Sequence, residues 1–431
     1  MYSSEIDRLF FIADNTILCN TAYPYEKSLF RKYQSNEDIM TGTKELSFYV
    51  HVPFCRQLCS FCEYTRFLAG DHQAEERYIG LLENQVKQYL DTHSVDMILG
   101  LDIGGGTPTA LPTELFDRLL SIGRCITDSA PVSADFEKSI EFSFSTIDRK
   151  KLELIGKYGY RRISTGLQTA DTKVLSKNDR TITSVDQVYD ILNAAHEIGI
   201  HKINIDLMYG MEFQTDASID ITLAEIARLM PDQVTLYETR YNRNRMVPPE
   251  ITRQLQYDQY CSLFYGLIAI GYQGRFGANT FSLCSDDGMS SYIRSRMLYG
   301  KPYKGFGISA QSLSRKGLTY GMLKNAKSVD FRQIEYLSEG DNYLLPPEEL
   351  AAKYVSVALY GGSFFLPVLS SIVGINADSY YHAELDYLKH HEYIDIIDEH
   401  VILTETGFRY YGAIAALFWS TDQKAALLSG L

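Results

Sequence analysis

The segment Leu46-Ser-Phe-Tyr-Val-His-Val52 is a short run of strand-forming residues that ends at Pro53. Similar runs alternate with polar, amphipathic stretches as far as residue 237. Strands that alternate with helices pair in parallel through right-handed crossovers. A stretch of about 190 residues fits six such units better than the eight of a closed barrel, which need about 250. We therefore predict an α/β fold built on a partial (β/α)6 barrel.

The predicted elements follow one another with short links. Strands are expected at 46–52, 97–103, 139–145, 162–167, 203–208 and 233–237, and helices at 72–93, 112–126, 148–158, 184–198 and 217–229. In such barrels the chemistry lies at the carboxyl ends of the strands. Polar or glycine residues occur at those ends in this chain, namely Cys55, Gly104 to Thr107, Glu141, Gln168, Asp206 and Glu238.

The rest of the chain divides around this core. We predict an N-terminal arm over 1–46, the barrel core over 47–240, an irregular, aromatic segment over 241–340 that closes the barrel on the substrate side, and a small C-terminal helical domain over 341–431. Within the last part, the alternation from Ile394 to Leu403 predicts a β-hairpin after a helix, similar to a winged helix. No basic face accompanies it, so we interpret it as a lid or packing module.

Composition excludes several classes of protein. The 431 residues include 54 acidic and 41 basic side chains, and a net charge of -13 argues against a strongly cationic binder of nucleic acid or of anionic membranes. No apolar run is long enough to predict a transmembrane helix, and we do not expect the first residues to form a signal peptide. Seven cysteines, an odd number in a long chain, fit a reducing cytoplasm better than a disulfide scaffold.

The strongest chemical signal is Cys55-Arg-Gln-Leu-Cys59-Ser-Phe-Cys62. Three thiols just past a strand end can converge on one iron–sulfur cluster, because thiolates are the ligands that such clusters need. Three ligands on a four-iron cluster leave one iron open to a small ligand. The alternatives are a zinc knuckle and three unrelated core cysteines. Zinc usually takes four ligands, and no fourth Cys or His follows at that spacing.

The longer pattern Tyr49-Val-His51-Val-Pro53-Phe-Cys55-x3-Cys59-x-Phe61-Cys62 resembles the signature of radical S-adenosylmethionine (SAM) enzymes. More narrowly, it resembles the oxygen-independent coproporphyrinogen III oxidase-like (HemN-like) branch. The resemblance covers about residues 20 to 312 and, more weakly, the C-terminal part. It continues through Gly104-Gly-Gly-Thr-Pro-Thr109, Ile140-Glu141, Ser164-Thr-Gly-Leu-Gln168, Arg180, Asn204-Ile-Asp206-Leu-Met-Tyr-Gly210 and Gly305-Phe-Gly-Ile-Ser-Ala310.

This resemblance implies the cofactors and the residues that hold them. It implies a [4Fe-4S] cluster on Cys55, Cys59 and Cys62, with the open iron chelating a SAM that is cleaved to methionine and a 5′-deoxyadenosyl radical. It also implies two SAM molecules in adjacent sites. Tyr49, Gly105 and Glu141 match the first site, and Tyr49 and Glu141 are expected nearest the chemistry. The matches to the second site are Phe61, Gly106, Thr107, Gln168, Arg180 and Asp206.

Physical arguments accompany part of this mapping. Gly104 to Gly106 would let backbone approach a ligand closely, although a tight βα turn explains them equally well. Glu141, in an apolar strand, could accept from an ammonium or a ribose hydroxyl. Arg180 and Asp206 could hold the two ends of a zwitterion, the alternative being a structural salt bridge.

Other polar residues receive plainer interpretations. His51 is expected to hydrogen-bond backbone beside the cluster loop. Four scattered cysteines are expected to be small buried hydrophobes: Cys19, Cys125, Cys261 and Cys284. A basic cluster follows the sixth strand and could bind substrate carboxylates or form a solvated loop: Arg240, Arg243 and Arg245.

The chain departs from the oxidases on the substrate side. Tyr64 stands where they carry a further cysteine, Arg240 where they have a small residue, and Gln311, which we predict to contact SAM, where they have an apolar residue. The long N-terminal arm, with Thr21-Ala-Tyr-Pro24, is similar to that of the oxidases and their methyltransferase relatives, and it disfavours a haem chaperone.

Three functions are therefore open. The first is a class C radical SAM methyltransferase-like enzyme that uses a second SAM to methylate or cyclopropanate an unsaturated metabolite. The second is oxidative decarboxylation of coproporphyrinogen III, and the third is a haem-binding, chaperone-like protein. The expected partners are a small-molecule substrate and an electron donor such as flavodoxin or ferredoxin, with no nucleic acid and no membrane.

Overall fold

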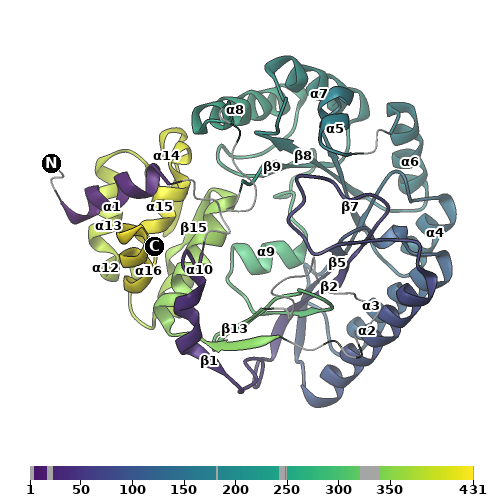
Figure 1. Cartoon of the computed structure of the whole chain (residues 1–431), viewed down its shortest axis with the longest axis horizontal. Coiled ribbons are helices and arrows are strands. Elements are labelled where there is room, and N and C mark those ends of the chain that lie inside the picture. Colours follow the sequence, from purple (N-terminus) through teal and green to yellow (C-terminus); the bar gives the residue numbers. More distant parts are fainter. Residues whose placement is uncertain are drawn as a thin grey trace.

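The computed structural model describes residues 4–16, 23–180, 183–241, 250–320 and 340–430, together with the single residues 248, 335 and 337. Its core is a curved sheet of parallel strands in chain order, surrounded by helices (Figure 1). The six core strands are β2 (Glu45–Val52), β5 (Met97–Gly105), β6 (Lys138–Phe142), β7 (Arg162–Gln168), β8 (Lys202–Tyr209) and β9 (Gln233–Glu238). Each pairs in parallel with the next, so the predicted partial barrel is confirmed.

The covering helices also lie where the sequence pattern predicts them. They are α2 (His72–Thr92), α3 (Thr113–Asp128), α4 (Arg149–Lys157), α6 (Val185–Glu197) and α7 (Asp216–Leu229), with an additional short helix α5 (Thr172–Lys177). Their apolar stripes are buried against the outer face of the sheet, as Phe116 and Leu119 of α3 are. The inner face is left to polar side chains such as Tyr49 and Glu141.

The sheet extends well beyond the six predicted strands. At one edge β11 (Tyr303–Phe306) pairs in parallel with β2, and at the other β10 (Thr280–Ser282) pairs antiparallel with β9. The extension beyond β11 consists of β12 (Ser312–Leu313), β13 (Gly317–Tyr320), β14 (Asp341–Leu344) and β1 (Gln34–Ser35). A two-stranded pair, β3 (Phe54–Cys55) and β4 (Phe67–Leu68), brackets the cysteine loop.

The expectation of an irregular segment over 241–340 was wrong in part. It contains α8 (Arg253–Ile270), an 18-residue helix that packs against α7, and α9 (Ser291–Met297). Thr252 caps α8 through its side chain, and Gly271 ends it in a left-handed conformation. Helix α9 packs on β5 and β2, inside the ring of strands in Figure 1.

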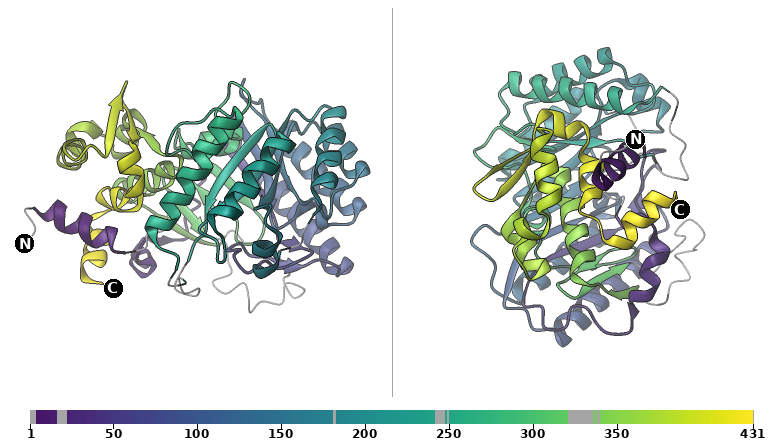
Figure 2. Two further views of the ribbon diagram at one scale, coloured as in Figure 1. Left: turned by 90° about the horizontal axis from the view of Figure 1, so that it is seen from above. Right: turned by 90° about the vertical axis from the view of Figure 1, so that its left-hand side faces the viewer.

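The C-terminal part is a separate layer beside the barrel (Figure 2). Its helices are α10 (Pro347–Ala358), α11 (Leu366–Val373), α12 (Ala377–Tyr380), α13 (His382–His390), α14 (Glu405–Arg409), α15 (Tyr411–Leu417) and α16 (Thr421–Ser429). The predicted hairpin after a helix is confirmed as β16 (Ile394–Ile397) and β17 (His400–Leu403), and β15 (Ser363–Phe365) adds a third strand. The N-terminal helix α1 (Glu5–Asp14) packs on α15 and α16, so both ends of the chain meet here.

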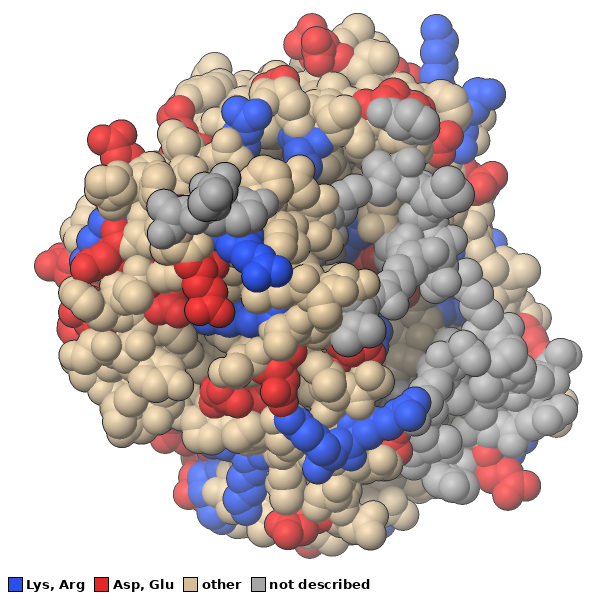
Figure 3. Space-filling model, turned by 60° about the vertical axis from the view of Figure 1, so that its left-hand side comes forward, with Lys and Arg blue, Asp and Glu red and all other residues tan. Residues whose placement is uncertain are grey.

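Surface features agree with the composition. No helix in the described ranges is long and apolar enough to cross a membrane. On the face drawn in Figure 3, acidic and basic side chains are interspersed. All six described cysteines are free. Cys125 and Cys284 are exposed, which corrects the expectation that the scattered cysteines are buried, whereas Cys19 lies outside the described residues.

Candidate active site

The cysteine loop leaves β3 at Cys55 and returns at β4. Arg66 holds the loop in shape, because its guanidinium donates to the carbonyl oxygen of Cys62 at 2.8 Å and to that of Cys59 at 2.6 Å. The N–H of Cys62 donates to the carbonyl of Cys59 at 3.3 Å, which forms a tight turn between these two thiols. The hydroxyl of Thr65 also donates to Ser309 Oγ at 2.7 Å and ties the loop to the Gly305–Ala310 run.

The three sulfurs lie within electrostatic range of one another. Burial raises the pKa of the Cys55 thiol to about 11, while the hydroxyl of Thr107, 3.6 Å from the sulfur, opposes the shift. Arg180 Nη1 lies 3.6 Å from Cys59 Sγ. No group of three or more His, Cys, Asp or Glu side chains in the described ranges is already drawn together as closely as a metal site requires. Binding would therefore gather the thiols and release their protons.

The glycine turn after β5 is a close packing point. Gly105 has φ +111°, and a Cβ there would overlap the His51 ring. His51 Nε2 must carry the proton, because its partner at 3.1 Å is the carbonyl of Thr65, which can only accept. Burial lowers the pKa of His51 to about 4, so the ring is neutral. The expectation that His51 bonds backbone beside the loop is confirmed.

Glu141 lies at the end of β6, directly opposite this turn. Its carboxylate accepts the N–H of Gly105 at 3.0 Å, and a Cβ at Gly104 would overlap the same carboxylate. The barrel wall shields the carboxyl group of Glu141, and this burial raises its pKa to about 7. The charges of Asp206 and Asp102 also raise the pKa, whereas the hydrogen bond from the Gly105 N–H lowers it. The side chain nevertheless remains open to the hollow interior, where a ligand could reach it.

Asp206 and Arg180 do not form the salt bridge that was one alternative. Asp206 Oδ1 accepts from Asn204 Nδ2 at 2.6 Å and from Ser164 Oγ at 3.5 Å. Arg180 donates to the Gly166 carbonyl and approaches Cys59 instead. Burial raises the pKa of Asp206 to about 7, and the charge of Arg162 opposes the shift. Arg180 also lowers the pKa of Asp206, so the two groups are within electrostatic range without forming an ion pair, as a zwitterionic ligand between them would need.

Gln168 has an unusual position at the end of β7. Its φ is +71°, and the pairing with β8 shifts register between Gly166 and Gln168, so the strand carries a bulge there. Its Oε1 is buried without a hydrogen-bond partner in the described part of the chain. A polar ligand or an ordered water at this strand end would satisfy the buried acceptor.

An open hollow of about 550 Å³ lies beside the cysteine loop. Cys59, Thr107 and Arg180 line it together with Gly166. Phe61 packs instead with Val174, Met208 and Met211 on the neighbouring wall. Two of the residues predicted for the second SAM therefore meet at one cavity next to a predicted cluster ligand.

Gly305 lies beside Tyr49, and Gln311 and Gly106 each make close backbone contacts nearby in the sheet. Gly305 of β11 pairs with Tyr49 of β2, and a Cβ on Gly305 would overlap the carbonyl of Gln311. This places Gln311 beside the first predicted SAM site. A Cβ at Gly106 would crowd the carbonyls of Val52 and Phe54, so this glycine is required for packing.

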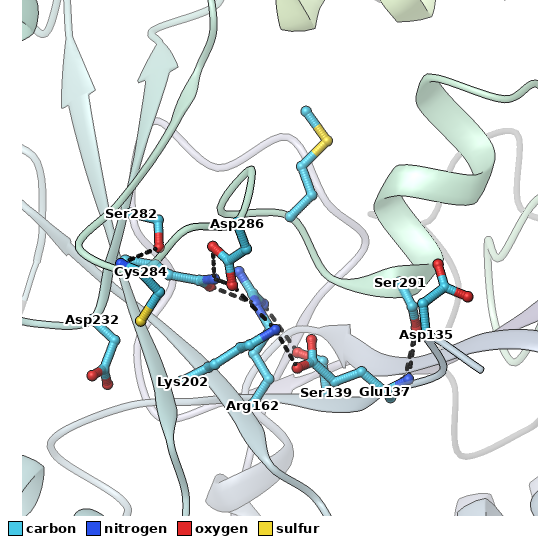
Figure 4. Close-up of polar contacts among 12 residues, drawn as sticks. Asp135, Glu137, Ser139, Arg162, Lys202, Asp232, Ser282, Cys284, Asp286 and Ser291 are labelled. Carbon is cyan, nitrogen blue, oxygen red and sulfur yellow. Dashed lines mark hydrogen bonds and ion pairs between the residues drawn. The ribbon is translucent and has the colours of Figure 1, made fainter. Parts of the chain in front are cut away.

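The floor of the barrel is closed by polar side chains at the strand starts (Figure 4). Arg162 donates to Gln233 Oε1 at 2.9 Å and to Ser139 Oγ at 3.0 Å. Lys202 pairs with Glu137 at 3.0 Å and with Asp286 at 3.2 Å. The positive charge of Arg162 opposes the rise in pKa of Asp102, Glu141 and Asp206 above it. The sequence did not predict this floor, because the hydrophobic pattern does not indicate where the side chain of an arginine at the start of a strand points.

The basic cluster after β9 is only partly described. Arg240 pairs with Glu63 at 3.2 Å, and its guanidinium lies 5.7 Å from the centre of the Tyr360 ring. It is therefore not part of a solvated loop, but joins the cysteine loop to the C-terminal layer. Arg243 and Arg245 lie outside the described residues.

Comparisons with known proteins agree with this geometry. The radical SAM superfamily profile matches residues 49–226. The anaerobic coproporphyrinogen III oxidase 1 of Cereibacter sphaeroides is 30% identical over 322 residues, which cover 68% of this chain and 67% of that protein. This chain belongs to the HemN-like, coproporphyrinogen III oxidase-like family of radical SAM proteins. The resemblance stated from the motifs is thereby confirmed.

Other HemN-like relatives match over a shorter range. The oxygen-independent coproporphyrinogen III oxidase of Escherichia coli is 32% identical over 194 residues, which cover 45% of this chain and 42% of that protein. The haem chaperone HemW of Bacillus subtilis is 28% identical over 192 residues, or 44% of this chain and 49% of that one. This chain thus spans less than half the length of these relatives. The structure of Escherichia coli HemN superposes with a TM-score of 0.71 at 22% identity, covering 91% of this chain and 93% of that one, which shows a shared fold.

Membership in this family implies a [4Fe-4S] cluster and SAM. The donor set of the loop fits such a cluster, because three buried or half-buried thiols lie on one loop and Thr107 and Arg180 offer donors to two of the sulfurs. The unpartnered Gln168 oxygen and the hollow beside Cys59 fit a polar ligand. The role of each named residue, and the domain limits, stay predictions.

Proposed function

We propose that this HemN-like protein oxidatively decarboxylates coproporphyrinogen III or a closely related propionate-bearing tetrapyrrole. The observation that carries the proposal is the match to the anaerobic coproporphyrinogen III oxidase of Cereibacter sphaeroides, which extends over 68% of this chain. The relatives described above are named as oxidases or as a haem chaperone, and they favour decarboxylation over the methylation that we expected first.

The proposal includes two SAM molecules beside a cluster on Cys55, Cys59 and Cys62. When bound, the cluster supplies the electron that splits SAM into methionine and a 5′-deoxyadenosyl radical. The electron would come from a small redox protein such as a flavodoxin or ferredoxin. The radical would take one hydrogen atom from a propionate side chain, and loss of CO2 with transfer of one electron to an external electron acceptor would leave the vinyl group. The residues of the barrel would position the reactants.

Those residues have distinct tasks. Glu141, open to the interior and braced by the Gly105 N–H, would accept hydrogen bonds from the ribose hydroxyls or the ammonium of the first SAM. Arg180 and Asp206, which do not neutralise each other, would hold the carboxylate and the ammonium of the second. Tyr49 would form the wall of the first site, since its ring stacks on Tyr292 at 5.7 Å.

The test is anaerobic turnover of the reconstituted protein with coproporphyrinogen III, SAM and dithionite. We expect vinyl-bearing product, released CO2 and 5′-deoxyadenosine, and we expect the gene to rescue a strain that lacks anaerobic haem synthesis. SAM cleavage that is never accompanied by decarboxylated product would refute the proposal.

Methylation of an unsaturated metabolite is the second candidate, and one observation favours it. Tyr64, at the position of a further cysteine in the oxidases, lies in the cysteine loop two residues after Cys62 and is 62% exposed. A tyrosine in place of the cysteine of the oxidases fits a reaction other than decarboxylation. Label transfer from methyl-deuterated SAM to a product would support methylation, whereas coproporphyrinogen turnover without such transfer would exclude it.

A further inference from the structure

Helix α9 is fixed inside the barrel at both of its ends. Ser290, its N-cap residue, donates to Asp102 Oδ2 on β5 at 2.7 Å. Ser295 Oγ lies 2.6 Å from Ser47 Oγ on β2. In addition, a Cβ at Gly100 would overlap the backbone of Tyr292, so β5 and the helix are in direct contact. The side chains of α9 are therefore held rigidly against the inner face of the sheet.

Arg296 is held between aromatic rings on this helix. Its guanidinium carbon lies 5.0 Å from the centre of the Tyr303 ring and 5.8 Å from that of Tyr292. Its Nη1 donates to the Tyr292 hydroxyl at 3.2 Å. Rings in these positions restrict the guanidinium and leave its remaining N–H donors free for a planar anion.

No carboxylate within the described ranges pairs with Arg296. Its neighbour on the same helix differs, because Arg294 pairs with Asp287 at 2.6 Å and with Asp135 at 3.7 Å. Arg240, which like Arg296 is within electrostatic range of Tyr64, pairs with Glu63. The pKa of Asp102 is raised by burial and lowered by the charges of Arg162 and Arg296, but Asp102 accepts from Ser290 and forms no ion pair with Arg296. A shielded arginine without an ion pair in the described residues favours binding of an anion from outside the chain.

The location of Arg296 relates it to the chemistry. The ring of Tyr292, one helical turn before Arg296, stacks on Tyr49 at an interplanar angle of 21°. Tyr49 belongs to the wall of the first predicted SAM site. An anion on Arg296 would therefore lie on the α9 side of that wall, within electrostatic range of Tyr64 in the cysteine loop.

We propose that Arg296 binds a carboxylate of the substrate and so decides which part of the substrate lies next to SAM. The inference rests on the proposed function, since a coproporphyrinogen carries several propionates, and it assigns one of them a fixed anchor. A bidentate guanidinium–carboxylate pair would hold that propionate while another is presented for decarboxylation.

The test compares Arg296→Met, Arg296→Lys and the control Arg294→Met in reconstituted holoenzyme. Each variant is assayed for KM and kcat with coproporphyrinogen III, for binding of coproporphyrin III by fluorescence quenching, and for the KM of SAM. Arg296→Met should raise the KM and the dissociation constant for the tetrapyrrole on the order of tenfold to hundredfold. Arg296→Lys should recover part of the loss, because it keeps the charge but not the fork. Arg294→Met should change neither constant comparably.

The outcomes separate the anchor from the reaction. Unchanged tetrapyrrole constants in Arg296→Met, an equal loss in Arg294→Met, or a raised KM for SAM alone would overturn the anchor. Wild-type protein that does not bind coproporphyrin III would also overturn it. Wild-type protein that binds coproporphyrin III through Arg296 but releases no CO2 would refute decarboxylation and leave the anchor standing.

Discussion

Glu141 and Gly105 form the contact on which the first SAM site depends. A carboxylate that is shielded by the barrel and lies near Asp206 and Asp102 ionises reluctantly, and the backbone N–H of Gly105 compensates only in part. The same two residues join β5 to β6 at the barrel mouth. Small changes here should therefore alter both SAM affinity and its dependence on pH.

We predict that SAM affinity of the wild-type protein rises as the pH rises through about 7, where Glu141 loses its proton. The ionised carboxylate accepts stronger hydrogen bonds from SAM than the protonated acid does. Glu141→Gln should bind SAM on the order of tenfold more weakly at pH 8 and show a weaker pH dependence, because only Asp206 would still titrate near pH 7. Equilibrium dialysis with labelled SAM at several pH values measures both effects, and an unchanged slope in the variant would contradict the assignment.

In the SAM-free protein, a rise in pH should lower the stability of the fold, whereas it raises the affinity for SAM. The pKa of Glu141 is raised above its unfolded value, so the folded state binds more protons between about 4.5 and 7. Stability to urea should therefore fall as the pH rises through that window. Glu141→Gln should flatten this part of the profile, and a profile identical to that of the wild type would count against the raised pKa.

Gly105→Ala tests the packing of the turn on His51. The positive φ and the overlap with the His51 ring should together cost about 2–4 kcal/mol of the free energy of unfolding. Gly159→Ala is the matched control, because Gly159 has φ +79° but nothing within 4 Å of its added Cβ, and should cost about 1–2 kcal/mol. If urea denaturation shows the same loss of unfolding free energy in both variants, the contact with His51 is not what requires glycine at position 105.

At the scale of elements, the parallel strands and their helices were predictable and the insertions were not. Each core strand is a compact apolar run bounded by glycine or polar residues, and the alternating helices leave few topologies. Helix α8 was not predicted because its own tyrosines, glutamines and apolar residues are spread over all sides of the helix. No apolar stripe therefore marks one face. Strand β11 was not predicted either, because it is short and contains Lys304 and Gly305, and because its partner β2 is far away in sequence.

The residues of the candidate site likewise divide into those that the sequence predicts and those that only the packing shows. The thiols, the glycine turn and Glu141 occur at strand ends, where the sequence pattern predicts chemistry. Arg296 could not be distinguished from Arg294 in the sequence, since only the packing of α9 shows which of them has a carboxylate partner. The missing Arg180–Asp206 salt bridge likewise depends on local contacts, with Gly166 for one and Asn204 for the other.

Arg162 supports the floor of the barrel as a unit. Arg162→Met would leave Gln233 and Ser139 without their buried donor, and we expect a loss of about 2–3 kcal/mol in stability. The adjacent Arg161→Met is the control, because Arg161 is exposed and contacts only a surface carbonyl, that of Gly199. Denaturation by urea compares the two, and similar stabilities would show that the floor is not a cooperative element.

At the scale of the whole molecule, the C-terminal layer is attached to the barrel mouth and to the N-terminus. Tyr411 of α15 donates to the Glu238 carboxylate at the end of β9, and Tyr360 lies against Arg240. The N-terminal helix adds Phe10, whose ring lies 5.2 Å from that of Tyr393 and 5.7 Å from that of Tyr410. The layer therefore packs against the barrel mouth, and its role as a lid or as a packing module stays a prediction.

Phe10→Ala should loosen this layer without unfolding the barrel. Phe10 is 7% exposed and Phe11 is 52% exposed, so the adjacent Phe11→Ala is a close control. Loss of the buried ring should cost about 3–5 kcal/mol locally. Hydrogen exchange should show faster exchange in α13, α15 and β16 of the Phe10 variant only, and faster exchange throughout the barrel would contradict a separate C-terminal layer.

The measurement that tests the central claim most directly is a single anaerobic reaction with two labels. Reconstituted protein receives coproporphyrinogen III with 13C in its propionate carboxyl groups, methyl-deuterated SAM and dithionite. We predict 13CO2 together with 5′-deoxyadenosine that carries no deuterium, because the hydrogen comes from the substrate. Deuterated 5′-deoxyadenosine without 13CO2 would contradict the account and identify the second SAM methyl group as the hydrogen source.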